Sequence, residues 1–139
     1  MRILFTLAVI LSFSSMAVAA EIDTITVGRC RIEVAIMKTP QEHASGLLGY
    51  TERTYPYEGM LFDMLDKRNK KTFHTVGMKM TIIIMGVTKL GDGSYKVIDG
   101  AYKAPPGRQS IPIDAPDVLE IPEGLYHLKF KHCLGAQGI

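Results

Sequence analysis

A run of four consecutive apolar residues, 82–85 (Ile-Ile-Ile-Met), constrains the fold of this chain more than any other feature. A half-exposed strand alternates apolar and polar residues, so a short run without polar positions indicates a strand that is covered on both faces. Such a strand lies centrally in a sandwich or a barrel. The chain must therefore place other elements on both sides of this segment.

Strand-like segments precede the apolar run. Residues 24–36 alternate well on both sides of Gly28, which predicts two short strands or one strand with a bulge. Residues 59–64 predict a strand, and a further strand opens at Thr72 after the charged turn 66–71. Because only a turn separates these last two strands, we expect them to be hairpin partners.

More strands are predicted after the apolar run. A Gly-Asp-Gly turn leads to a strand over residues 95–101, whereas residues 105–117 begin with Pro-Pro-Gly and predict a loop that does not pair as sheet. Residues 118–121 and 125–132 predict a closing hairpin, because Tyr126, Leu128 and Phe130 share one face of its second strand.

One helix is predicted near the start of the strand-rich region. Thr39 can cap it, Pro40 suits its first position, and Glu42 lies three residues after the cap, as a capping box requires. This helix should run from Pro40 to about Leu48. Many short strands with one small helix indicate a mainly β protein, a small antiparallel β-sandwich or partly closed barrel with one short α-helix near the mature N-terminus.

The first 20 residues have the three parts of a secretory signal. Arg2 supplies a positive end, residues 3–13 are apolar, and residues 17–20 (Ala-Val-Ala-Ala) supply small residues for cleavage. An uncleaved membrane anchor is the alternative, but polar residues interrupt the run. We therefore expect a signal peptide over 1–20 and one β-rich domain over 21–139, periplasmic or secreted, with no membrane span after cleavage.

The net charge and the length of the chain limit the classes of partner and the number of domains that we expect. The net charge of the 139-residue chain is +2, so no excess of positive charge is available for a polyphosphate, and nucleic acid is not expected as a partner. A chain of this length fits a single domain with one modest core. We expect a monomer that binds a small ligand or an envelope protein.

Two cysteines, Cys30 and Cys133, occur in this chain. An oxidising compartment favours a disulfide between them. Strand alternation places Cys30 on an apolar face, whereas in the predicted last strand Cys133 shares its face with histidine and lysine. The sequence therefore leaves both a bridge and two separate thiols open.

Four stretches, in this order, resemble the domain of unknown function 192 family of small bacterial and archaeal proteins. They are residues 39–48, residues 59–62 (Gly-Met-Leu-Phe), the segment 73–79, and residues 115–124 with their strand and turn. The tetrapeptide is the most recognisable of the four, and the set covers most of the mature chain. The resemblance implies a compact β fold and does not imply a reaction.

The chain departs from the family pattern at three polar positions. Tyr50 stands where members usually carry arginine, and Arg53 substitutes for it only if one residue is inserted. Met80 stands where many members have asparagine, and Gly86 aligns with the aspartate that usually ends the next strand. These changes alter the polar groups around which the family would build a site.

Candidate catalytic and metal-binding groups do not form a ready site. His127 and His132 lie five residues apart, so on a strand they would point to opposite faces, and no metal or cofactor is expected. Carboxylate pairs, Glu120 with Glu123 among them, are interpreted as residues of solvated turns. A hydrolase or redox protein that uses His74, His132 or Cys133 remains the alternative to a binding module.

A noncatalytic binding or accessory module is the function that we expect. Its site should lie where the segment 73–79 approaches residues 59–62 and the tyrosines of residues 50–57, because aromatic and basic groups gather there beside an apolar core. The candidate ligand-binding residues are Tyr50, Arg53, Phe73, His74, Met78 and Lys79. The identity of the ligand or partner stays open.

Overall fold

The computed structural model describes residues 20–68 and 70–134. The predicted signal peptide, except for Ala20, therefore lies outside the described residues. The elements in chain order are β1 (Glu21–Val27), β2 (Cys30–Met37), α1 (Pro40–Ser45), β3 (Gly59–Phe62), β4 (Lys70–Phe73), β5 (Ile82–Lys89), β6 (Tyr95–Ala104), β7 (Ile111–Asp114), β8 (Asp117–Pro122), α2 (Glu123–Leu125) and the short π-helix η1 (Tyr126–Phe130).

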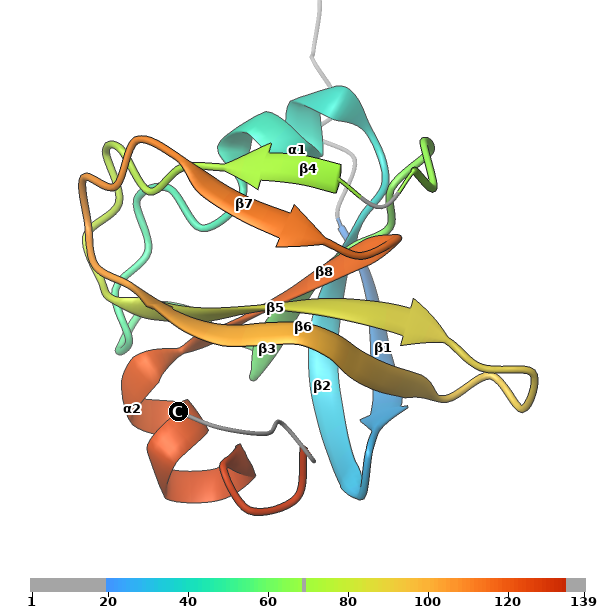
Figure 1. The fold of residues 1–139 in the computed structure, drawn as a ribbon. Coiled ribbons are helices and arrows are strands. Elements are labelled where there is room, and N and C mark those ends of the chain that lie inside the picture. Colours follow the sequence, from blue (N-terminus) through green and yellow to red (C-terminus); the bar gives the residue numbers. More distant parts are fainter. Residues whose placement is uncertain (1–19, 69, 135–139) are drawn as a thin grey trace, which may run out of the picture.

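Six strands close into a barrel in the order β1-β2-β3-β8-β5-β6 (Figure 1). Most neighbours are antiparallel, but β2 pairs with β3 in parallel, and β6 meets β1 in parallel at Tyr95 and Val27. Strands β4 and β7 form a separate two-stranded sheet. The predicted mainly β class and barrel are thus confirmed.

Alternation along the strands produces two apolar cores. In β5 the side chains of Ile83 and Met85 join the core inside the barrel, whereas those of Ile82 and Ile84 join a second core outside it. Strand β5 lies between β6 and β8 and is buried on both faces, as residues 82–85 predict. Figure 1 shows α1, β4 and β7 on the side of the barrel opposite to α2.

Helix α1 begins as the sequence predicts. The side chain of Thr39 accepts a hydrogen bond from the Glu42 backbone, and the Glu42 carboxylate accepts one from the Thr39 backbone, so the capping box is complete. The helix ends at Ser45 rather than at Leu48. Gly46 terminates it with a positive φ of 42°, a conformation that favours glycine.

The predicted hairpin between residues 59–64 and the strand at Thr72 is wrong. Strand β3 already has a neighbour on each edge, β2 and β8, so neither edge is left for β4. Strand β4 instead pairs with β7, which lies inside the segment 105–117 that was expected not to pair as sheet. Pro112 is accommodated because this sheet has only two strands, both with a free edge.

The predicted strand over residues 125–132 is also wrong, because this segment is helical. Tyr126, Phe130 and Leu134, spaced by four, are buried against the barrel core, whereas Leu128 between them is 86% exposed. Burial at a spacing of four is that of a helix. The alternation of residues 126–130 therefore does not indicate which side chains are buried.

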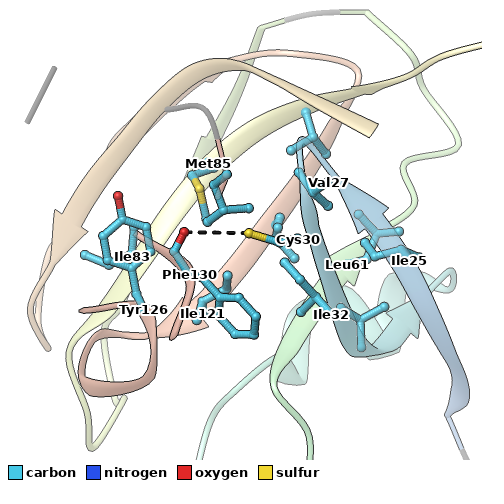
Figure 2. Close-up of a cluster of buried hydrophobic side chains, with 14 of the residues drawn as sticks. Ile25, Val27, Cys30, Ile32, Leu61, Ile83, Met85, Ile121, Tyr126 and Phe130 are labelled. Atoms are coloured by element: carbon cyan, nitrogen blue, oxygen red, sulfur yellow. Dashed lines mark hydrogen bonds between the residues drawn. The ribbon is translucent and has the colours of Figure 1, made fainter. Parts of the chain in front are cut away.

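The helical C-terminal segment brings Cys133 to Cys30, and the two form a disulfide with a Cα–Cα distance of 5.2 Å. The objection from strand alternation does not apply, because Cys133 does not lie on a strand. Figure 2 shows Cys30 among the barrel-core side chains, with its sulfur directed at the carbonyl oxygen of Phe130. The two atoms are 3.7 Å apart. A disulfide sulfur carries no hydrogen, so this approach is a contact and not a donated hydrogen bond.

Gly86 occupies a crowded position. A Cβ at Gly86 would lie 2.5 Å from the Cβ of Ala115 and 3.0 Å from that of Asp99. The pairing of β5 with β6 also shifts register at this residue. Only glycine fits here without a backbone shift.

Over the described residues, no helix has the length and apolar character needed to cross a membrane.

Candidate ligand-binding site

A pocket of about 290 Å³ opens in the second core, between the end of α1 and the strands β3 and β4. Its walls are mostly apolar, and its size is at the lower end for small-molecule sites. The lining residues come from four parts of the chain: His43–Leu48 on and after α1, Phe62 and Met64 at the end of β3, residues 71–74, 76 and 78 on and after β4, and Glu120 on β8.

Aromatic rings form the wall between β3 and β4. The rings of Phe62 and Phe73 meet edge to face with centroids 5.5 Å apart, and the ring of His43 lies 5.6 Å from that of Phe62. The Nε2 of His43 is 2.7 Å from the carbonyl oxygen of Met37, so it donates there and the ring orientation is set. These contacts hold α1 over the pocket.

Among the residues that the structure describes, Glu120 is the one carboxylate that lines this pocket. It lies in the middle of β8, between Met60 on β3 and Ile84 on β5, and is only 5% exposed. Strand alternation directs its side chain to the second core, with Val118, rather than into the barrel. A carboxyl group thus lies within an apolar layer.

The Glu120 carboxyl makes no hydrogen bond or ion pair with any described residue. Burial raises its pKa from 4.5 to about 8, because a carboxylate loses its hydration there and gains no partner. Among described residues, every side-chain nitrogen or oxygen that is fully sealed from solvent has a partner. The oxygens of the Glu120 carboxyl are therefore not fully sealed from solvent, and Glu120 lines the pocket.

The interpretation of Glu120 as a residue of a solvated turn is wrong. Its neighbours in sequence, Val118, Leu119 and Ile121, are fully buried. A charged residue within such an apolar strand is the signal that could have revealed it, since charged residues are rarely buried without a partner. Glu123, by contrast, forms an ion pair with Lys103.

The other ionisable groups of the pocket are basic. The amino group of Lys71 donates a hydrogen bond to the carbonyl oxygen of Ala115 at 2.8 Å and another to that of Arg68. Partial burial lowers the pKa of Lys71. His74 is exposed at the rim, immediately after β4.

The structure brings together three of the six predicted ligand-binding residues. Phe73, His74 and Met78 line the pocket. Arg53 and Lys79 are exposed and lie outside its lining, and Tyr50 belongs to a neighbouring depression. The approach of segment 73–79 to residues 59–62, expected from the sequence, is present in the contact between the rings of Phe73 and Phe62.

Tyrosines gather in the neighbouring depression instead. The ring of Tyr55 meets those of Tyr50 and Tyr57 edge to face, with centroids 5.3 and 5.8 Å apart. The Tyr55 hydroxyl donates to the carbonyl oxygen of Gly59 at 2.5 Å, and burial raises the pKa of this phenol. The tyrosines thus contact the start of β3, in a depression separate from the pocket that Glu120 lines.

The groups of the enzymatic alternative do not converge. Cys133 forms the disulfide, so it offers no thiolate. His132 follows η1, whereas His74 follows β4 on the opposite side of the barrel (Figure 1). Within residues 20–68 and 70–134, no three His, Cys, Asp or Glu side chains lie close enough together to hold a metal ion.

No family model matches the chain, and no curated protein of similar sequence was found. Two solved structures resemble it. A protein of unknown function from Novosphingobium aromaticivorans is 25% identical, with a TM-score of 0.56 over 81% of this chain and 86% of that one. A protein from Sinorhizobium meliloti described as a "putative transcription regulator" is 20% identical, with a TM-score of 0.54 over 80% and 88%. Both likenesses support the fold.

Proposed function

We propose that this protein is an exported, noncatalytic binding module that holds a small ligand in the pocket beside α1. The observation that carries this proposal is the carboxyl of Glu120, which is 5% exposed, has no partner among the described residues and lies in the wall of an apolar pocket. A buried polar group without a partner is destabilising, and native proteins retain few of them outside functional sites. Export rests on the signal-like residues 1–20.

The shape of the site favours a small molecule over a protein partner. The polar carboxyl is reached through a concavity, and the rings of Phe62 and Phe73 form part of its wall. Pockets that combine apolar walls with few polar groups are typical of small-ligand sites. An envelope protein would reach Glu120 only by inserting a side chain.

Filling the pocket from α1 tests this function. Ala44 is exposed and lines the pocket, so Ala44→Trp should fill its mouth without changing either core. We expect the neutral fluorescent probe N-phenyl-1-naphthylamine to bind the wild-type protein and to bind this variant at least about tenfold more weakly, a difference of about 1.4 kcal/mol. A fluorescence titration measures both affinities.

The matched control is Gln41→Trp. Gln41 is exposed on the same helix but lies outside the pocket lining, so this variant should bind the probe as the wild type does. Equal binding by the wild type and both variants would contradict a site in this pocket, and so would absence of binding to the wild-type protein.

A further inference from the structure

We propose that the ligand is a neutral, largely apolar molecule with one primary amide or lactam group, which pairs with the carboxyl of Glu120. This inference rests on the proposed binding function and adds the chemical class of the ligand. It is carried by the position of Glu120 in an apolar wall, by the absence of a partner for it among described residues, and by the charges that surround the pocket.

The first observation concerns the hydrogen bonds that Glu120 can offer. Its carboxyl lies 5% exposed between Met60 and Ile84 and uses none of its hydrogen-bonding capacity on described residues. A protonated carboxyl presents one donor and one acceptor side by side. A primary amide or lactam presents the complementary acceptor and donor, so one such group satisfies both positions.

The second observation concerns charge. The ionisable side chains that face the pocket besides Glu120 are His43 from α1, Lys71 from β4 and His74 after β4, and all are bases. Tyr55 does not line the pocket, and its hydroxyl donates to the carbonyl oxygen of Gly59; burial, and secondarily the charge of Glu120, raise the pKa of this phenol, so it stays neutral. A cationic ligand would pass these bases on entry, and Glu120 is the one acidic group of the described pocket lining that it would meet.

The third observation concerns the walls. An anionic group beside Glu120 would be placed in an apolar layer that includes Phe62, Phe73 and Met78, where an unpaired charge is strongly disfavoured. The same walls favour a hydrocarbon or aromatic body. A neutral polar group next to Glu120 and an apolar body against the rings are therefore the combination that the pocket accommodates.

Three compounds with the same phenylpropyl skeleton separate these classes. We expect 3-phenylpropanamide to displace N-phenyl-1-naphthylamine from the wild-type protein at pH 6.5 at a concentration at least about tenfold lower than 3-phenylpropylamine or 3-phenylpropanoate requires. Raising the pH to 9 should weaken the amide about tenfold, because Glu120, with a pKa of about 8, then loses its proton and its donor.

Two variants at one position make the test specific. Glu120→Gln keeps a donor and an acceptor and removes the titration, so it should bind the amide at pH 6.5 and keep that affinity at pH 9. Glu120→Leu removes both groups and should lose the preference for the amide while it still binds the neutral probe. Probe binding by each variant shows that the pocket has folded.

The outcomes distinguish this inference from the proposed function. If the wild-type protein does not bind the probe, both are overturned. If it binds the probe but the amine displaces best and gains affinity with rising pH, only the neutral class is wrong and the ligand is a cation. Equal displacement by the amide in the wild type and in Glu120→Leu would likewise overturn the pairing with Glu120.

Discussion

Replacing both cysteines by alanine is expected to lower the free energy of unfolding by about 4 kcal/mol. The bridge joins residues that are 103 positions apart in sequence, so it closes most of the described part of the chain into one loop. Closing a loop of this length removes much conformational freedom from the unfolded chain. Urea unfolding of the Cys30→Ala/Cys133→Ala variant and the wild type measures the difference.

Native contacts around the bridge support a large effect. The Arg29 backbone donates to the carbonyl oxygen of Cys133 at 2.8 Å, and Gly28 fits against the same segment, since a Cβ there would lie 2.7 Å from the Leu134 carbonyl oxygen. The bridge therefore holds α2 and η1 over the barrel core, where Figure 2 shows Tyr126 and Phe130. Reducing the wild type should reproduce the loss, and the reductant should leave the double variant unchanged. An unaltered urea midpoint would refute the effect.

Raising the pH from 5 to 9 is expected to remove about 4 kcal/mol of the stability that Glu120 contributes. In the folded protein its pKa is about 8, whereas an exposed glutamate titrates near 4.5. Between these values the folded state keeps a proton that the unfolded state has lost. Stability due to this group is therefore greatest below pH 4.5, falls as the pH rises towards 8, and levels off above pH 8.

Glu120→Gln isolates this contribution, because its side chain does not titrate. Between pH 5 and pH 9 the urea midpoint of the variant should stay nearly constant, whereas that of the wild type should fall. At pH 9 the variant should be the more stable protein. Glu33→Gln is the matched control, since Glu33 is exposed on the barrel strand β2. If the wild type and Glu120→Gln respond to pH in parallel, Glu120 does not titrate as its burial implies.

Sequence patterns predicted those parts of the fold in which residues close together in sequence determine the structure by themselves. The apolar run 82–85 implies burial on both faces, and β5 has it. The side chains of Thr39 and Glu42 carry the whole capping box within four residues, so the start of α1 needs no tertiary information. Gly28 has a positive φ of 58° at the turn that separates β1 from β2.

Other parts depend on long-range packing that a local pattern does not contain. Residues 126–130 alternate like a strand, but the spacing of Tyr126, Phe130 and Leu134 suits the helical face that packs on the barrel core. Strand β4 pairs with β7 because both edges of β3 are occupied, which depends on the closure of the barrel.

Only the part of the candidate site that lies in one short segment of sequence was predicted. Phe73, His74 and Met78 lie in one short segment, and their chemistry indicated a pocket that the fold then places beside Phe62. Glu120 belongs to a strand nearly 50 residues further along the chain. Its role depends on burial between two neighbouring strands, which its charged side chain alone argues against.

Mapping the bound probe on the protein tests whether the pocket lined by Glu120 is the binding site. Backbone ¹H–¹⁵N spectra should be recorded with increasing N-phenyl-1-naphthylamine. We expect the largest shifts on and after α1, at Phe62 and Phe73, and at Glu120. Shifts confined to the tyrosine depression around Tyr50 and Tyr55, or spread over the surface, would contradict a binding site at the Glu120 pocket.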